Sequence, residues 1–245
     1  MIISDVPTFS DGTATPQREY IMAEVIITGP EGRLEGRYHH VESATAPLAV
    51  ILHPHPQYGG NMNNRVVQGL AHMFAKRGFG TLRFNFRGVG RSQGEYGRGE
   101  GELMDAAAAL DWLQTLKPES KTVWVAGFSF GAWIGMQLLM RRPEMGGFIS
   151  ISPPANMYDF SFLAPCPSSG LIIHGDADEI VPQEAVLRLV DKLALQKGII
   201  VDYENIEGAG HVFGKKLEMM LGRCEAYLDR RIEEDGIFQS LPEED

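Results

Sequence analysis

Residues 122–133 read T-V-W-V-A-G-F-S-F-G-A-W, and this stretch decides how the surrounding chain folds. Its first residues prefer β-strand, and an apolar run that favours helix follows. Between them lies G-x-S-x-G, residues 127–131, a pattern that can also occur by chance. Where a strand turns at once into a helix, the central residue occupies a tight elbow and raises its side chain above the sheet edge. The flanking glycines let strand and helix backbones pass closely. Ser129 is therefore a candidate nucleophile.

Strand and helix patterns alternate on both sides of this elbow. Two early strands, 22–28 and 34–41, are joined by so short a turn that we expect them to be antiparallel. From residue 48 onward the alternation predicts an α/β fold with a mostly parallel sheet and helices on both faces. The further strands are expected at 48–52, 81–86, 148–152, 171–174 and 199–203. The helices are expected at 61–77, at 102–116, after the elbow, after Pro182 and at 215–233.

Length and composition narrow the class of protein. The chain has 245 residues, 44% of them apolar, which suits one large domain with a full core. We assign residues 1–20 to an N-terminal arm, 21–234 to a single domain and 235–245 to an acidic tail. The net charge of −10 argues against nucleic acid or an anionic membrane as the main partner. No segment has the pattern of a signal peptide or reaches the ~20 apolar residues of a membrane span, so we expect a cytoplasmic protein.

Two loops after late strands carry residues that could activate Ser129. A serine hydroxyl needs a base to take its proton, and that base needs a carboxylate to fix its tautomer. The base is His211, in the sequence G-A-G-H, where the glycines let the ring reach over the sheet edge. The acid is Asp178 or Asp176, two residues apart in one loop. One of these could orient the histidine while the other accepts hydrogen bonds from the turn.

Acyl transfer also needs N–H donors for the negative oxygen of its tetrahedral intermediate. One donor is expected from the backbone amide that follows the nucleophile, that of Phe130, and the other from the loop after residues 48–52. This loop reads H-P-H-P-Q, and its prolines have no N–H. The second donor is then His55, Gln57 or a residue just beyond, and we favour His55.

Two patterns have weaker functional interpretations. His53-x-His55 could bind a metal, but no carboxylate or thiol stands at the expected spacing, and we predict no metal site. The G-x-G-x-x-x-G at 88–94 is one residue too long for a dinucleotide loop, and we interpret it as a turn. We therefore expect no organic cofactor.

Some side chains in these loops could contact a substrate. Arg87, Arg91 and Arg98 could bind an acidic group, although solvated loop charges are the simpler interpretation. Five aromatic residues could line an acyl pocket, and ordinary packing explains each of them equally well: Tyr58, Tyr158, Phe160, Phe162 and Phe213.

With these residues in place, the chain resembles the α/β-hydrolase superfamily over residues 20–230. The motifs that carry the resemblance are G-F-S-F-G at 127–131, F-N-F-R-G-V-G-R-S at 84–92, H-G-D-A-D-E-I-V-P at 174–182 and G-A-G-H at 208–211. The order Ser, Asp, His is also that of α/β-hydrolases. The resemblance assigns Ser129 as nucleophile, Asp178 as acid and His211 as base. It implies the α/β-hydrolase fold, with the antiparallel strands at the N-terminal edge of the sheet.

Within the superfamily, H-P-H-P-Q-Y-G-G-N at 53–61 is similar to lidless bacterial hydrolases related to dienelactone hydrolases and the prolyl-peptidase-like branch. Dienelactone hydrolases usually carry cysteine at the nucleophile position, whereas this chain has serine. Many relatives insert a cap after the strand that follows the elbow helix. Here only residues 153–169 are available, too few for a cap domain. An open site of this kind favours small or protruding substrates.

The residues thus predict a serine hydrolase that acts on a small carboxylic ester or thioester without a cofactor. A peptidase or amidase with the same three residues is an alternative, because the sequence does not show how well an amine leaving group would be protonated. A non-catalytic binding module is another, because a fold does not guarantee an activity. The antiparallel strands at the sheet margin could also seed a homo-oligomer.

Overall fold

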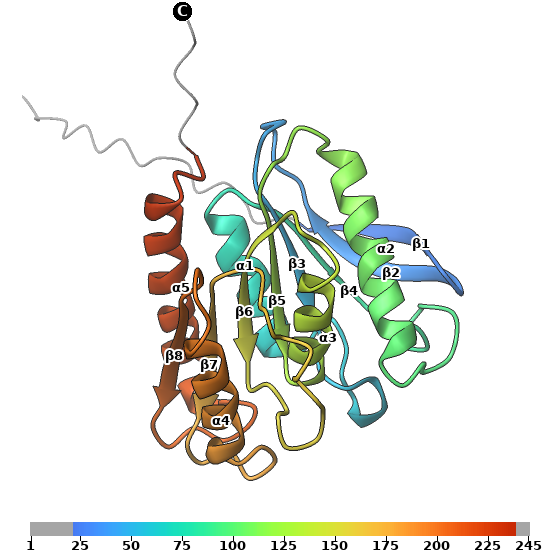
Figure 1. The fold of residues 1–245 in the computed structure, drawn as a ribbon. Helices are drawn as coiled ribbons and strands as arrows, with labels where there is room; N and C mark the ends of the chain where they lie inside the picture. Colours follow the sequence, from blue (N-terminus) through green and yellow to red (C-terminus); the bar gives the residue numbers. More distant parts are fainter. Residues whose placement is uncertain (1–21, 239–245) are drawn as a thin grey trace, which may run out of the picture.

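The computed structural model describes residues 22–238, so the predicted N-terminal arm at 1–20 and most of the predicted acidic tail lie outside the described residues. Within this range strands and helices alternate along the chain (Figure 1). The strands are β1 (Ala23–Gly29), β2 (Gly32–His39), β3 (Leu48–Leu52), β4 (Gly80–Phe84), β5 (Val123–Phe128), β6 (Met145–Ile151), β7 (Gly170–Gly175) and β8 (Val201–Ile206). The helices are α1 (Arg65–Lys76), α2 (Glu100–Leu116), α3 (Phe130–Leu139), α4 (Gln183–Ala194) and α5 (Leu217–Glu234), with short 3-10 helices η1 (Pro56–Tyr58) and η2 (Gly214–Lys216).

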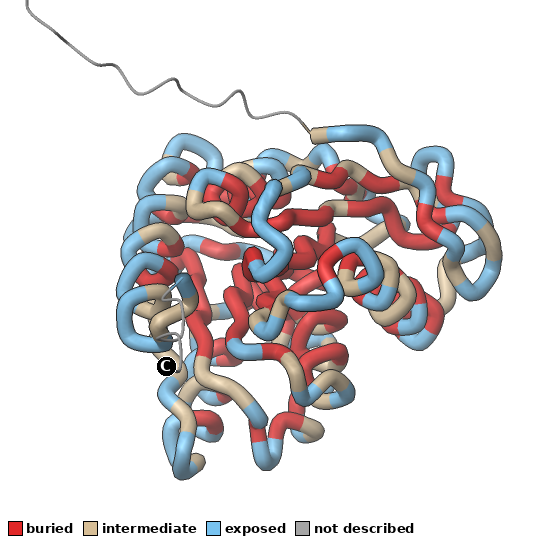
Figure 2. The backbone as a smooth tube through the Cα atoms, turned by 90° about the horizontal axis from the view of Figure 1, so that it is seen from above, coloured by how far each residue is buried: buried red, intermediate tan, exposed pale blue. Residues whose placement is uncertain are grey.

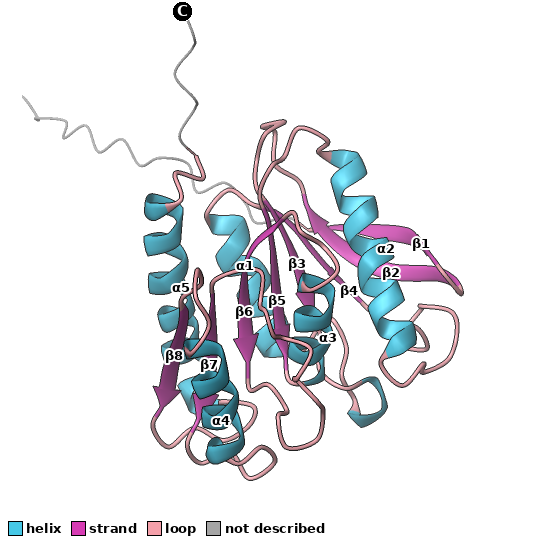
Figure 3. Cartoon of the chain, in the orientation of Figure 1, coloured by secondary structure: helices cyan, strands magenta, loops and turns pink. Residues whose placement is uncertain are grey.

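The strands of residues 22–238 form one eight-stranded sheet in the order β1-β2-β4-β3-β5-β6-β7-β8. From β4 to β8 every neighbouring pair is parallel, whereas β2 is antiparallel to both β1 and β4. The carboxyl ends of the parallel strands therefore share one edge of the sheet, the lower edge in Figure 1. Figure 3 shows that loops extend beyond this edge. The predicted fold class, with antiparallel strands at the N-terminal margin, is confirmed.

The β1–β2 hairpin forms because its turn contains only two residues between paired ends. Gly29 pairs with Gly32, and Gly32 has a φ of 123°, a backbone conformation that residues with a Cβ rarely adopt. The pairing of β1 with β2 continues without a bulge from this turn to Ala23, which lies opposite Tyr38. The short turn at residues 29–32 was thus a sufficient signal for the antiparallel pairing.

The core lies on both faces of the sheet. Every residue of β3, β5 and β7 is buried. For β3, the continuous apolar sequence predicts a strand that is covered on both faces. One apolar cluster packs α2, α3 and α4 on one face, with Leu110, Ile134 and Val186 among its members. A second packs α1 and α5 on the other face, with Leu70 and Met220. Figure 2 shows the buried residues in the interior and the exposed ones on the outer loops and helix surfaces.

Element boundaries differ from the sequence-based expectations by a few residues, for local reasons. Helix α1 begins at Arg65 instead of Asn61 because the Asn64 side chain caps it by accepting a hydrogen bond from the Val66 amide at 2.9 Å. Helix α3 ends at Leu139, before Pro143 is reached. Strand β8 is shifted to Val201–Ile206. No helix within residues 22–238 is both long and apolar enough to cross a membrane.

Candidate active site

Ser129 occupies the predicted elbow between β5 and α3, with φ 54° and ψ −119°. This positive φ is strained for a residue with a Cβ, and close backbone packing holds it. A Cβ on Gly127 would lie 2.3 Å from the Gly131 carbonyl oxygen, and one on Gly131 would lie 2.4 Å from the Leu52 oxygen, so neither position accepts a side chain. The Ser129 amide donates to the Ile151 oxygen at 2.8 Å. The two glycines of G-x-S-x-G thus allow the elbow to form against the end of β3.

Folding brings the three predicted catalytic side chains together at the carboxyl edge of the sheet. The Ser129 Oγ lies 3.0 Å from His211 Nε2, and His211 Nδ1 lies 2.7 Å from Asp178 Oδ2. Ser129 and Asp178 are buried, and the His211 side chain is 11% exposed. The three residues follow β5, β7 and β8, whose carboxyl ends lie at the same edge of the sheet, with β7 next to β8 and β6 between β5 and β7. The arrangement is a continuous chain of hydrogen-bond contacts from hydroxyl to carboxylate.

The loop after β7 shows which of its two aspartates faces His211. Asp178 Oδ1 accepts hydrogen bonds from the Ile180 and Val181 amides, both at 2.9 Å, which leaves Oδ2 for His211. Asp176 instead accepts from the Gly208 amide at 2.6 Å and from Asn205 Nδ2 at 3.1 Å. Asp178 is therefore the partner of the histidine, and Asp176 joins its own loop to the loop after β8.

The surroundings of Asp178 favour its ionised form. Burial alone raises the pKa of this carboxyl, but the hydrogen bonds from His211, Val181 and Ile180, together with the charge of His211, outweigh burial and hold the pKa below its ordinary value. A carboxylate that stays ionised can accept the Nδ1–H of His211. The proton on Nδ1 then leaves Nε2 free to accept the Ser129 proton.

Two contacts near His211 were not predicted from the sequence: the hydrogen bond from His174 to Val181 and the packing of the His211 ring on Phe128. His174 is fully buried, and its Nε2 donates to the Val181 oxygen at 2.9 Å, which closes the loop whose amides hold Asp178. Phe213, which follows His211 by two residues in the sequence, is buried and has a φ of 60°. The His211 ring packs 5.2 Å from the Phe128 ring. The sequence motif at 174–182 can be recognised, but it does not show that His174 contacts Val181 or that His211 packs on Phe128.

The loop after β3 lies against the elbow, where the second oxyanion donor was predicted. The His55 oxygen accepts from the Tyr58 and Gly60 amides at 3.1 and 3.0 Å, and Gly60 passes so close to Pro54 that a Cβ would lie 2.0 Å from its oxygen. The ring of His55 lies 4.8 Å from that of Phe130. The Phe130 amide is the first of α3, and such amides have no acceptor within the helix. The two residues predicted as oxyanion donors are thus neighbours.

The side chain of His55 is fixed by two polar partners. Its Nδ1 accepts from the Gln57 amide at 3.2 Å, so the proton is on Nε2, which lies 3.0 Å from the Tyr96 hydroxyl. Burial lowers the pKa of His55, partly offset by the charge of Glu102, and the neutral ring fits this pattern. Tyr96 was not identified from the sequence, since it lies 41 residues away in the loop before α2.

Both ring nitrogens of His53 form hydrogen bonds to backbone atoms, so neither nitrogen is free to bind a metal. Its Nδ1 donates to the Pro54 oxygen at 2.6 Å, and its Nε2 accepts from the Phe86 amide at 3.0 Å. The ring thereby ties the end of β3 to the loop after β4. In the described part of the chain, no group of three or more His, Cys, Asp or Glu residues is arranged to hold a metal ion.

We expect acid to destabilise the protein through His53. Burial lowers its pKa from 6.5 to about 4. Between these values the unfolded chain binds the proton and the folded protein does not, so the free energy of unfolding should fall by about 3 kcal/mol as the pH drops through this window. His53→Gln keeps an acceptor for the Phe86 amide without titrating. Urea unfolding at pH 7 and pH 4 should therefore show a smaller pH-dependence in this variant than in the wild type. An equal loss of stability in both proteins would contradict this assignment, and the exposed His40→Gln is the control.

The expectation that Arg87 is a solvated loop charge is wrong, because its side chain is buried. It makes a two-point ion pair with buried Asp105, through Nε at 3.0 Å and Nη2 at 2.8 Å, and contacts Glu31 through Nη1 at 2.6 Å. Arg91 pairs with Glu35 at 2.9 Å. These two arginines anchor the loop after β4 and do not offer a free charge to a substrate.

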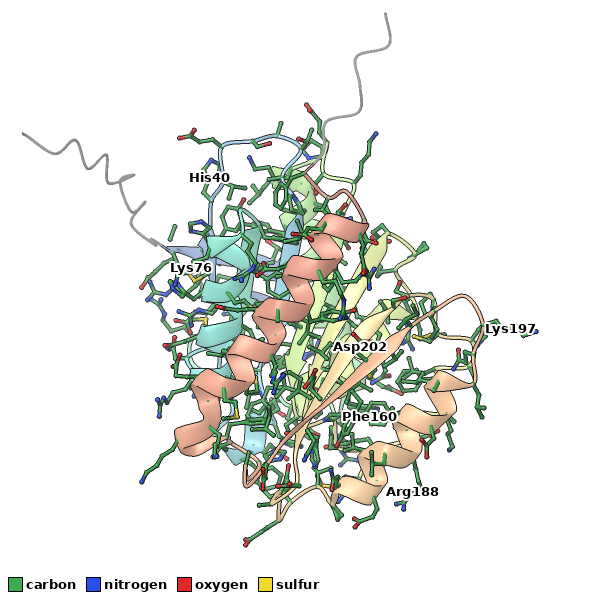
Figure 4. All side chains as sticks on the ribbon, turned by 90° about the vertical axis from the view of Figure 1, so that its left-hand side faces the viewer. His40, Lys76, Phe160, Arg188, Lys197 and Asp202 are labelled. Atoms are coloured by element: carbon green, nitrogen blue, oxygen red, sulfur yellow. The ribbon has the colours of Figure 1, made fainter. Side chains whose placement is uncertain are left out.

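The five aromatic candidates separate into two groups. Phe213 is buried in the cluster under α1 and α5, and Phe160 is buried in the cluster beside α4 (Figure 4). Phe162 is partly buried and stacks on Phe160 with centroids 6.0 Å apart. Tyr158 and Tyr58 instead reach the surface near the elbow, and Tyr58 is 86% exposed.

Comparison with known proteins places this site in a family. The sequence model of the X-Pro dipeptidyl-peptidase (S15 family) matches residues 42–170, which is more than half of the chain and includes the elbow. The chain is an α/β hydrolase of the S15 family. The matched region ends before Asp178 and His211, so the similarity to the family covers Ser129 and the loop after β3.

Relatives of this hydrolase extend the similarity beyond that region. A protein of unknown function from Agrobacterium tumefaciens, described as a candidate α/β hydrolase, is 62% identical with a TM-score of 0.85, over 86% of this chain and 97% of the other. An α/β serine hydrolase without a lid from Xanthomonas campestris is 33% identical with a TM-score of 0.77, over 88% and 97%. An uncharacterized protein of Rickettsia prowazekii is 51% identical over 84% of this chain and 89% of its own. The description of the Xanthomonas protein as lidless agrees with the short connection between β6 and β7 in this hydrolase.

Proposed function

We propose that this hydrolase cleaves a small carboxylic ester or thioester through an acyl-enzyme on Ser129. The observation that supports this is the chain of contacts from Ser129 Oγ through both nitrogens of His211 to Asp178, at 3.0 and 2.7 Å. Both distances lie within the range that proton transfer and tautomer control require.

In the proposed first step, Ser129 Oγ bonds to the substrate carbonyl carbon while its proton moves to His211 Nε2. The carbonyl oxygen takes up the electron pair and is held by the Phe130 amide and, we propose, the His55 amide. When the carbonyl re-forms, the bond to the leaving oxygen or sulfur breaks, and that atom takes the proton from His211. Water then repeats the sequence on the acyl-enzyme and releases the acid. Asp178 balances the positive imidazolium in both halves of the cycle. The route needs neither a metal nor an organic cofactor.

Geometry around the nucleophile supports a small substrate. The connection between β6 and β7 is too short to carry a cap domain, so this segment forms no folded lid that would enclose a long chain. An ester or thioester also has a leaving group that needs less assistance from the acid than an amine does. These two points favour esters and thioesters over amides.

A peptidase is the second candidate, because the matching family is described by its X-Pro dipeptidyl-peptidase activity. The two can be separated with matched substrates. We expect p-nitrophenyl acetate and S-phenyl thioacetate to show much higher kcat/KM than p-nitroacetanilide, which has the same acyl group, and than alanyl-prolyl-p-nitroanilide. Faster cleavage of the dipeptide anilide would favour the peptidase. A lack of turnover on all four would favour a binding module on this fold.

A further inference from the structure

Six aromatic rings form a continuous surface beside the elbow, with Phe130 at its centre. The Phe130 ring lies 4.8 Å from His55, 6.2 Å from Tyr96, 5.6 Å from Trp133 and 5.9 Å from Tyr158. Tyr58 adds to the outer side of His55, at 4.7 Å. Phe130 is buried, whereas the other five are only partly buried or exposed. We call these six residues the aromatic wall.

The rings of the wall are held in place before any ligand arrives. Trp133 stacks on Tyr158 with centroids 4.2 Å apart, and its Nε1 donates to the Asp159 oxygen at 3.1 Å. Its other side packs on Gly99, where a Cβ would lie 2.5 Å from the indole. The Tyr96 hydroxyl forms a hydrogen bond with His55 Nε2 at 3.0 Å, which fixes two further rings of the wall. Rings that are already fixed lose little conformational freedom when a ligand binds to them.

The wall and the catalytic histidine lie over opposite faces of the sheet. Tyr96, Trp133 and Tyr158 pack on the apolar cluster of α2, α3 and α4, to which Phe130 belongs. His211 instead rests on Phe128, which belongs to the cluster of α1 and α5. The side chains before and after Ser129 thus point to different faces, and Ser129 lies between the histidine and the wall.

This placement decides which part of a substrate meets the wall. The leaving atom must lie near His211 Nε2, because that nitrogen returns the proton. The carbonyl oxygen must face the Phe130 amide. The remaining substituent of the carbonyl carbon is the acyl group, and it extends away from His211, toward the rings.

We propose that the aromatic wall is an acyl subsite for planar aryl groups, so that the preferred substrates are esters or thioesters of arenecarboxylic or arylalkenoic acids. This inference rests on the proposed ester or thioester hydrolysis and adds the acyl class to it. Flat rings meet other rings through offset-stacked or edge-to-face contacts, which a saturated ring of the same size cannot make as well. Tyr158 and Tyr96, which are partly exposed, and Tyr58, which is exposed, offer ring surface for such contacts.

A matched pair of substrates tests the proposal. The esters p-nitrophenyl benzoate and p-nitrophenyl cyclohexanecarboxylate have the same leaving group and acyl rings of similar size, one planar and one puckered. Their kcat/KM ratio is divided by the ratio of their rates of hydroxide hydrolysis, which removes the difference in intrinsic reactivity. We expect the corrected ratio to favour benzoate by about tenfold in the wild type. Tyr158→Leu and Trp133→Leu should bring the corrected ratio close to one.

Two control variants separate the ring from other effects. Tyr158→Phe keeps the ring without the hydroxyl and should keep the aryl preference. Tyr203→Leu, on the edge strand β8, should leave the ratio unchanged, because among the described residues Tyr203 stacks on no ring of the wall. A wild-type ratio near one, or a preference that survives both leucine variants, would overturn the proposal while Ser129-dependent ester hydrolysis still stands.

If no ester is turned over, the proposed function fails and the subsite is tested by binding instead. Ligand-observed NMR of Ser129→Ala with methyl benzoate and methyl cyclohexanecarboxylate should then show tighter binding of the benzoate, by about fivefold or more, and a loss of that preference in the double variant with Tyr158→Leu. Equal binding of the two esters would reject the aromatic subsite in its own right.

Discussion

Ser129→Ala is expected to lower kcat/KM for p-nitrophenyl acetate by roughly 10⁴- to 10⁶-fold. Without the Oγ, His211 has no hydroxyl to deprotonate at 3.0 Å, and no acyl-enzyme can form. Residual rate would come from binding and from the oxyanion donors alone. Steady-state hydrolysis, followed by p-nitrophenol release in wild-type and variant proteins purified side by side, measures the loss.

Ser152→Ala is the matched control for this variant. Ser152 is also buried, also follows a parallel strand and also has a positive φ, of 45°. Within residues 22–238 the Ser152 hydroxyl has no hydrogen-bond partner, so the turnover of Ser152→Ala should stay within about twofold of the wild type. If Ser129→Ala retained a tenth or more of the wild-type turnover, another group would have to be the nucleophile.

The second large effect is expected from Asp178→Asn. The asparagine oxygen would keep the hydrogen bonds from the Ile180 and Val181 amides, which turns the NH₂ group toward His211 Nδ1. That nitrogen must then be unprotonated, so Nε2 carries the proton and cannot accept one from Ser129. We expect kcat/KM to fall on the order of 10³- to 10⁴-fold with the fold intact.

Asp176→Asn separates this effect from a general change of charge in the loop. The substitution keeps an oxygen for the Gly208 amide and does not touch His211. Its kcat/KM should change by less than about tenfold. Similar losses in Asp176→Asn and Asp178→Asn would show that loop charge matters, and not the tautomer of His211.

Local patterns were enough to predict the sheet and the elbow that carries Ser129. The alternation of apolar strands with helical segments depends on periods of two and 3.6 residues, and each buried strand carries its own signal. The elbow is equally local, because Gly127 and Gly131 act on backbone atoms within a few residues of Ser129. The order Ser, Asp, His then pointed to loops that a parallel sheet brings to one edge.

The remaining features depend on contacts between distant segments, which no local pattern encodes. Asp176 and Asp178 have the same chemistry, and contacts with the segment at and beyond the end of β8 distinguish them: Gly208 contacts Asp176, whereas His211 contacts Asp178. Arg87 looked like a solvated charge because its buried partner, Asp105, lies 18 residues away on α2. Tyr96 joins the site through His55, 41 residues earlier. In each case the partner comes from a different element.

Covalent capture of the nucleophile tests the central claim most directly. A fluorophosphonate reacts with a serine only where a neighbouring base activates the hydroxyl and donors stabilise the phosphorus oxygen. We predict one adduct per chain, located on Ser129 by peptide mass spectrometry, with strongly slowed labelling in His211→Ala. An adduct on a different residue, or no adduct on the folded wild-type protein, would contradict the account.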